Sequence, residues 1–250
     1  MATTFLDHPG PLAFAHRGGA AHAPENTWRA FEHAIGLGYR YLETDLQATA
    51  DGVLLAFHDR TLSRVTGMTG RVSKMAHADL ASARVGGTDP IPLLEDLLGA
   101  WPDARFNIDV KDAAAIRPLA EVMRRTRAWD RVCVASFSAS RLRATRQALD
   151  RPVCMSASPF GAFAVRIGGP TGWLARCGVR CVQVPAATAT EAFVARAHGL
   201  GLQVHAWTVN DRGAMGQLLD LGVDGIMTDE TVTLRDVLTA RSQWYPLSPG

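Results

Sequence analysis

The chain has 250 residues, of which 47% are hydrophobic, and its formal net charge is +2. This length and hydrophobic content suffice for a full core, either in one domain of barrel size or in two small domains. A charge so close to neutral argues against a polyelectrolyte that binds nucleic acid. No stretch is long enough for stable membrane insertion, and residues 1–11 lack the features of a signal peptide, so we expect a cytoplasmic protein.

Short apolar runs alternate with helical patterns along most of the chain. The predicted strands cover residues 12–15, 40–47 with an extension over 53–57, 105–110, 131–136, 152–156, 179–184, 202–207 and 223–228. The predicted helices cover residues 27–36, 93–100, 114–127, 138–149, 189–199, 211–221 and 231–239, with a loop or short helix before residue 176. Alternating strands and helices indicate a parallel sheet with helices outside it.

Eight strand–helix units in about 250 residues match the TIM (β/α)8 barrel. A doubly wound open sheet is the alternative, although the sequence after the first predicted strand is not a dinucleotide-binding fingerprint. Residues 60–92 are rich in glycine and proline, and we interpret them as a short insertion after strand two. We therefore expect one domain over residues 1–240, followed by a loose C-terminal tail over residues 241–250.

The four cysteines are Cys133, Cys154, Cys177 and Cys181. Three of them lie in or beside apolar runs, and no Cys-x-x-Cys pair is present. We expect buried free thiols rather than a structural zinc site or a disulfide.

Ionisable side chains stand at or near the ends of several predicted strands. They are His16 and Arg17 after the first strand, Glu43 and Asp45 on the second, His58 after its extension, and Asp109 and Lys111 at the third. Successive strand side chains point to opposite faces, so two acids that are two residues apart share one face. Since the carboxyl ends of barrel strands meet at one rim, we expect all of these side chains to converge there.

The three acids, Glu43, Asp45 and Asp109, need compensation if they lie side by side in an apolar setting. Carboxylates without clustered cysteine or histidine suit a hard divalent cation, so Mg²⁺ or Ca²⁺ fits better than zinc. The acids therefore predict a metal site.

The remaining ionisable residues at the rim suit work on a phosphate. Arg17 and Lys111 are cations of the kind that bind phosphate oxygens. His16 and His58 can divide the proton transfers, one accepting a proton from the attacking oxygen and the other protonating the departing one. Together with a metal, they predict phosphoryl transfer.

Nine motifs resemble, in order and spacing, the signatures of the glycerophosphodiester phosphodiesterase family. They are His16-Arg17-Gly18, Pro24-Glu25-Asn26-Thr27, Glu43-Thr44-Asp45, Thr49-Ala50-Asp51-Gly52, His58-Asp59, Ile108-Asp109-Val110-Lys111, Ser136-Phe137, Ala206-Trp207-Thr208-Val209-Asn210 and the segment 222–229. The resemblance covers residues 12–230, and the set of motifs is far more specific than any one of them.

The resemblance implies a TIM barrel that hydrolyses glycerophosphodiesters, such as glycerophosphocholine or glycerophosphoethanolamine, to glycerol 3-phosphate and an alcohol. It also implies one divalent cation, Mg²⁺ or Ca²⁺ with Mn²⁺ as a further option. The implied site residues are His16 and His58 for acid–base catalysis, Glu43, Asp45 and Asp109 for the metal, Arg17 and Lys111 for the phosphate, and Glu25, Asn26 and Trp207 in support. The resemblance implies that the glycerol hydroxyl of the substrate attacks phosphorus first, which gives a cyclic phosphate that water then opens; direct attack by water is the alternative.

Two alternatives stay open from the sequence. One is a lysophospholipase D or sphingomyelinase D-like enzyme that acts on choline lipids, and the other is a non-catalytic phosphate-binding barrel. We expect soluble, deacylated substrates, because no amphipathic surface helix stands out in the sequence. The chain departs from the family at Asp109, where the family usually has Glu, and the shorter side chain leaves the metal preference open.

Overall fold

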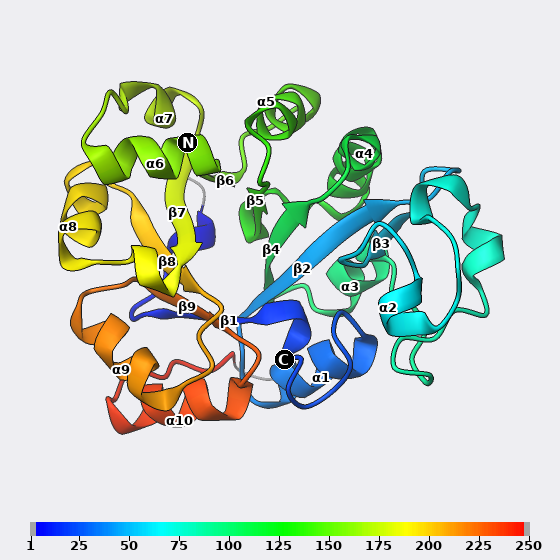
Figure 1. Cartoon of the computed structure of the whole chain (residues 1–250), viewed down its shortest axis with the longest axis horizontal. Coiled ribbons are helices and arrows are strands. Elements are labelled where there is room, and N and C mark those ends of the chain that lie inside the picture. The colour runs from blue at the N-terminus through cyan, green and yellow to red at the C-terminus, as the bar shows by residue number, and fades with distance from the viewer. Residues whose placement is uncertain (1–3, 248–250) are drawn as a thin grey trace.

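The computed structural model describes residues 4–247, and it forms a closed barrel of eight parallel strands with helices around it (Figure 1). The barrel strands are β1 Leu12–Ala15, β2 Tyr41–Ala48, β4 Arg105–Val110, β5 Val132–Ala135, β6 Cys154–Ser156, β7 Val179–Pro185, β8 Gln203–Trp207 and β9 Gly225–Thr228. β1 pairs in parallel with both β2 and β9, and these two pairings close the barrel. The predicted TIM barrel is confirmed.

The helices follow the strands in alternation and pack outside the barrel. They are α1 Trp28–Gly36, α2 Ser63–Thr66, α3 Leu94–Ala100, α4 Ile116–Thr126, α5 Ala139–Ala148, α6 Pro159–Ile167, α7 Gly172–Arg176, α8 Glu191–Gly199, α9 Arg212–Asp220 and α10 Thr231–Ala240. Their starts follow local chemistry: Thr27, for example, caps α1 by accepting a hydrogen bond from the backbone N–H of Ala30 at 3.2 Å.

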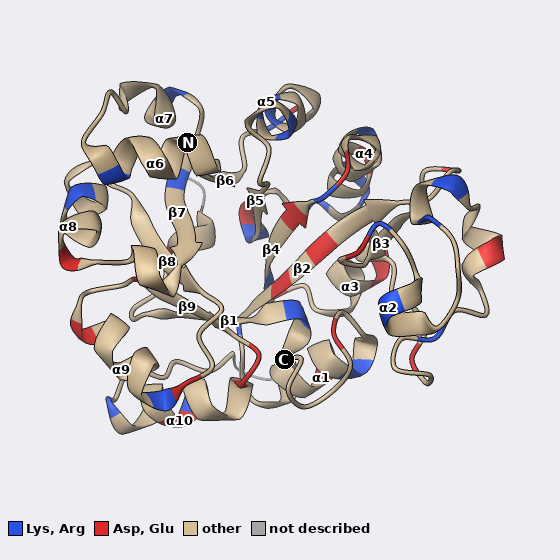
Figure 2. Cartoon of the chain, in the orientation of Figure 1, with Lys and Arg blue, Asp and Glu red and all other residues tan. Residues whose placement is uncertain are grey.

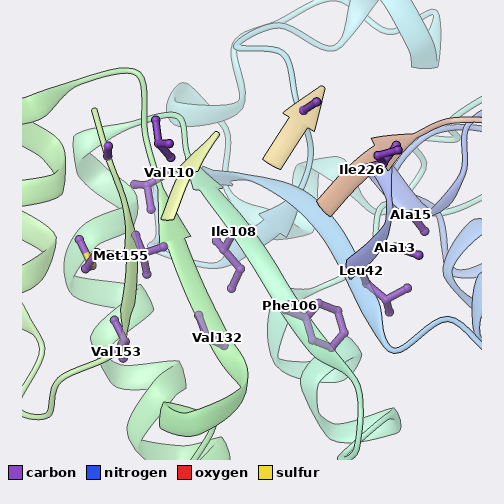
Figure 3. Close-up of a cluster of buried hydrophobic side chains, with 14 of the residues drawn as sticks. Ala13, Ala15, Leu42, Phe106, Ile108, Val110, Val132, Val153, Met155 and Ile226 are labelled. Carbon is purple, nitrogen blue, oxygen red and sulfur yellow. The ribbon is translucent and has the colours of Figure 1, made fainter. Parts of the chain in front are cut away.

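The strands place their side chains in two separate apolar layers. One side of each strand packs against the helices, as Leu42, Ile108 and Val132 do in Figure 3. The other side points into the barrel, where Phe14 and Tyr41 belong to a second buried cluster. Among the described residues, no helix has the length and apolar character needed to cross a membrane.

The run after strand two does not prolong that strand in the same direction. Residues Leu54–Ala56 form β3, which pairs antiparallel with β2 as a hairpin. The turn is closed by Thr49, whose hydroxyl accepts from the backbone N–H of Val53 at 2.9 Å, and by Gly52 with a φ of 83°. Only β2 therefore continues the barrel, and β3 leads the chain away to the insertion.

The insertion over residues 60–92 has regular structure despite its many glycine and proline residues. It contains α2 and two 3-10 helices, η3 Val72–Lys74 and η4 His77–Leu80. Its apolar side chains form a small cluster with Leu55 and Phe57 at and after β3. The segment is thus packed onto the barrel hairpin, and it lies at the right of Figure 1 beside α3.

The expected loose tail is wrong for residues 241–247. Trp244 packs against the main core, and its ring lies 5.1 Å from that of Tyr39 between centroids. The backbone N–H of Leu247 donates to the carbonyl of Gly38 at 2.8 Å. Trp244 therefore anchors the segment, although the sequence pattern around it indicates neither a helix nor a strand. Residues 248–250 lie outside the described residues.

Candidate active site

A cavity of about 490 Å³ opens at the carboxyl ends of the barrel strands. Its lining includes eight of the ten predicted site residues, namely His16, Arg17, Glu43, Asp45, His58, Asp109, Lys111 and Trp207. The other two, Glu25 and Asn26, contact members of this set from the loop before α1. Figure 2 shows the acidic positions of β2 and β4 on neighbouring strands of the barrel.

The two acids of strand two lie inside β2, and not at its end as predicted. β2 runs on to Ala48, while β1 stops at Ala15 opposite Leu42. Glu43 and Asp45 therefore stand just beyond the end of β1, at the level of the rim. Asp45 is in register with Asp109 on β4, which places these two acids on adjacent strands at the same height.

The turn after β1 has an unusual backbone that aims its groups at the site. Arg17 has a φ of 51°, and its backbone N–H donates to Oε2 of Glu43 at 3.0 Å. Gly18 follows with a φ of 84°, and a Cβ there would lie 2.8 Å from the Cβ of Ala30. The glycine is needed because both its conformation and its contact with α1 exclude a side chain.

His16 is held by a carboxylate from the far end of the chain. Its Nδ1 lies 2.7 Å from Oδ1 of Asp229, and Asn210 donates to the other Asp229 oxygen at 2.9 Å. Its Nε2 lies 3.9 Å from Oε2 of Glu43. Burial disfavours the charged imidazole, but the negative charges of Glu43 and Asp229 outweigh burial and raise the pKa of His16.

His58 is held in the same manner by its neighbour in sequence. Its Nδ1 lies 2.6 Å from Oδ1 of Asp59. Arg64 of α2 donates to Oδ2 of Asp59 at 2.5 Å and, through its two terminal nitrogens, to the carboxylate of Glu25 at 2.8 and 2.6 Å. One function of the insertion is therefore to supply the arginine that fixes this pair.

Lys111 lies between two of the predicted metal ligands. Its Nζ is 2.8 Å from Oδ1 of Asp45 and 2.5 Å from Oδ2 of Asp109. Burial disfavours its charge, but the two carboxylates outweigh burial and raise the pKa of Lys111. Burial raises the pKa of Asp109, whereas Lys111 and Arg17 overcome burial and lower that of Asp45.

Glu43 is the acid with the weakest compensation. It is 5% exposed, and burial together with the charge of Asp45 raises its pKa to about 7. Asp109 has a buried carboxylate oxygen, Oδ1, without a hydrogen-bond partner among the described residues. Buried acids with an unsatisfied oxygen and a raised pKa fit a site that takes up a cation. The carboxylate oxygens of Glu43, Asp45 and Asp109 are not all within 4.8 Å of one another here, because no group of three acids with that spacing is found between residues 4 and 247.

The two supporting residues, Asn26 and Glu25, contact the site residues Asp45 and Arg17 without lining the cavity. Asn26 is buried, donates to Oδ2 of Asp45 at 3.1 Å and accepts from the hydroxyl of Thr44 at 2.8 Å. Glu25 accepts from Arg17 at 3.0 Å as well as from Arg64. Asn26 thus orients an acid, and Glu25 joins two arginines.

Trp207, at the end of β8, forms part of the cavity wall. Its ring meets that of Phe137 edge-on at 5.7 Å between centroids. The ammonium of Lys111 lies over the Phe137 ring, 5.5 Å from its centroid. Part of the cavity wall is therefore aromatic.

Sequence reasoning did not assign a role to Asp59, Arg64, Asn210 or Asp229. Asp59 follows His58 directly, so its position was a usable signal. Asp229 is 213 residues away from His16 and meets it only because β9 pairs with β1. Arg64 lies in the insertion, where the sequence pattern indicates no orientation for a side chain.

The fold and the contents of the cavity define a barrel hydrolase for an anionic substrate. Residues 16–233 match the model of the Glycerophosphoryl diester phosphodiesterase family, and the chain belongs to this family. It is accordingly an enzyme, a phosphoric diester hydrolase.

Individual relatives agree with this assignment. The chain is 43% identical to the "Probable glycerophosphodiester phosphodiesterase 2" of Mycobacterium tuberculosis, over 96% of this chain and 95% of that protein. It is 30% identical to a glycerophosphodiester phosphodiesterase of Bacillus altitudinis, over 86% and 93% of the two chains. An Oleispira antarctica phosphodiesterase, solved with the product sn-glycerol-3-phosphate, has the same fold with a TM-score of 0.80, 22% identity and coverage of 92% and 97%.

We expect Asp229→Asn to lower the pKa of His16, because the negative carboxylate favours the imidazolium and a neutral amide does not. The pKa can be measured by NMR titration of the His16 ring in chelator-treated protein. Asp224→Asn is the matched control, since Asp224 pairs with His198 and not with His16. An unchanged or higher pKa in Asp229→Asn would show that this pair does not set the charge of His16.

Proposed function

We propose that the chain hydrolyses glycerophosphodiesters to glycerol 3-phosphate and an alcohol, with a divalent cation and two histidines as its catalytic groups. The observation that carries this proposal is the parallel arrangement of His16 and His58. Each ring has its Nδ1 on a carboxylate, and both rings line one cavity with three buried acids. The product named in the Oleispira antarctica structure supports the choice of substrate.

The carboxylate partners determine which ring atom of each histidine can move a proton. With Nδ1 engaged by Asp229 or Asp59, Nε2 is the atom that faces the substrate. One imidazole accepts the proton of the attacking hydroxyl, and the other protonates the oxygen of the departing alcohol. The two carboxylates keep both rings oriented during these transfers.

Glu43, Asp45 and Asp109 are the residues that would hold the cation. When bound, a divalent cation supplies charge neutralisation and Lewis acidity to the phosphate. Oxygen ligands alone favour Mg²⁺ or Ca²⁺, with Mn²⁺ as an acceptable substitute. With a cation held by these acids, the ammonium of Lys111 and the guanidinium of Arg17 would be the groups that bind the phosphate oxygens.

The direct test is turnover of glycerophosphocholine and glycerophosphoethanolamine by chelator-treated enzyme after addition of Mg²⁺, Ca²⁺ or Mn²⁺. We expect no turnover without a cation and a loss of about 10²-fold or more in kcat for His16→Ala, as for removal of a general acid or base. Asp109→Asn should raise the cation concentration needed for half-maximal rate. His77→Ala, outside the cavity, is the control. Full activity in chelator would contradict the metal role, and an active His16→Ala would contradict the assignment of His16.

Arg64 should matter for activity although it does not line the cavity. Arg64→Ala removes the donor that fixes Asp59 and Glu25, so we expect a roughly 10-fold lower kcat with little change in KM, in the range of losses for outer-shell partners. Arg71→Ala is a matched change in the same insertion, because Arg71 is exposed. Equal kinetics for the two variants would show that the insertion does not position His58.

A second candidate is activity on lysophospholipids, and one observation favours it. α6 exposes Phe160, Phe163 and Ile167 to solvent by 66%, 55% and 62%, and Phe163 also lines the catalytic cavity. Phe137, exposed by 59%, lines the same cavity, so apolar side chains stand at its mouth. Such a surface suits an acyl chain.

If lysolipids are substrates, Phe163→Ser should lower kcat/KM several-fold for lysophosphatidylcholine and leave that for glycerophosphocholine unchanged, because only the former has an acyl chain to bury. Choline release measures both reactions. Leu200→Ser, on an exposed leucine after α8, is the control for general loss of surface apolarity. Equal effects on the two substrates, or no turnover of the lysolipid, would exclude this candidate.

A further inference from the structure

Three cysteines meet inside the barrel, below the catalytic cavity. Cys133, Cys154 and Cys181 come from the consecutive strands β5, β6 and β7, and each is fully buried. Their sulfur atoms all lie within 4.8 Å of one another, and those of Cys133 and Cys181 are 3.9 Å apart. This is the single such group of potential metal ligands between residues 4 and 247.

A histidine from the next strand lies beside this group, although neither of its ring nitrogens is within 4.8 Å of all three sulfur atoms. This residue, His205 on β8, is fully buried, and its imidazole interacts electrostatically with the Cys181 thiol. The side-chain oxygen of Gln203 lies 3.2 Å from Nε2 of His205, which favours a proton on Nε2 and leaves a lone pair on Nδ1. That lone pair accepts a long hydrogen bond of 3.4 Å from the amide nitrogen of Gln183, which also donates a shorter one of 2.8 Å to Asn107. Binding of an ion at Nδ1 would replace the longer bond.

We propose that Cys133, Cys154, Cys181 and His205 bind one thiolate-preferring ion, Zn²⁺, at a structural site within the barrel. Three thiolates and one imidazole are a ligand set that zinc takes at closed structural sites. Sulfur atoms about 3.8 Å apart are what tetrahedral geometry requires for a zinc–sulfur bond of about 2.3 Å. The separation of 3.9 Å between Cys133 and Cys181 therefore needs little adjustment.

The site is distinct from the proposed catalytic cation site. None of the three cysteines lines the catalytic cavity, whereas Asn107 and Gln183 do. These two amides are hydrogen-bonded to each other, and they separate the thiols from the cavity lining. The ligand chemistry also differs, because hard cations prefer the carboxylates of the rim and soft ones prefer thiolates.

The position of the site gives it a structural purpose. β6 has only three residues, and its pairing with β7 shifts register between Met155 and Ser156. This is a weakly bonded part of the barrel wall. An ion held by β5, β6, β7 and β8 would join four adjacent strands there. Zinc takes cysteine ligands as thiolates, so binding at a thiol that carries its proton would release that proton.

The test uses untagged full-length protein purified from zinc-supplemented cells and passed over a chelating resin. Elemental analysis should find about one zinc per chain, as for a closed structural site. Cys133→Ser and Cys154→Ser should lose it, and Cys177→Ser should keep it, because Cys177 lies at the end of α7 outside the group. Cobalt added to apo-protein should give thiolate-to-cobalt charge-transfer absorption in wild type and in Cys177→Ser.

A wild-type protein with reduced thiols that holds no zinc and gives no cobalt charge transfer would overturn the proposal. So would zinc that survives in Cys133→Ser and disappears in Asp45→Asn, since that ion would belong to the rim. If the serine variants do not fold, stepwise titration of wild type with a mercurial decides the matter. If zinc is released as three thiols are modified, the result supports the site. If zinc is released while the thiols stay unmodified, the result contradicts the proposal.

Discussion

The arrangement of the barrel mouth depends on the burial of three carboxylates at one level. Glu43, Asp45 and Asp109 are each at most 6% exposed, and an uncompensated buried charge costs several kcal/mol. In this structure Lys111 and the backbone N–H of Arg17 supply part of the compensation. The strained turn at Arg17, the glycine after it and the buried asparagine behind Asp45 all follow from this requirement. A divalent cation would complete the compensation that the protein alone provides only in part.

A second constraint is the orientation of the two histidines by carboxylates. Asp229 directly follows the last barrel strand and holds His16, whereas Asp59 directly precedes the insertion and holds His58. Arg64 and Glu25 extend the second arrangement into a network of ion pairs. The insertion thereby contacts the partner of His58 without lining the cavity, and α6 adds the exposed side chain of Phe163 to the cavity lining.

The eight strands and the residues of the site could be predicted because strand alternation and barrel topology together bring strand ends to one rim. What escaped prediction depends on register and on side-chain direction. Asp229 reaches His16 through the closure of the barrel, and Trp244 anchors a tail that has no periodic pattern. The thiol group escaped for the same reason: its members are far apart in sequence, and only the pairing of β5, β6 and β7 brings them together. Lys111 lies between two acids, and the spacing of these residues in the sequence could not predict that position.

Binding of Mn²⁺ to chelator-treated protein, followed by electron paramagnetic resonance, tests the central claim that the buried acids exist to hold a cation. Mn²⁺ prefers oxygen ligands over thiolates, so the signal reports on the rim. The account predicts about one bound Mn²⁺ per chain, displaced by Mg²⁺ or Ca²⁺ and lost in Asp45→Asn, as expected for a carboxylate site for hard cations. A folded wild-type protein that binds no Mn²⁺, and still hydrolyses its substrate in chelator, would contradict it.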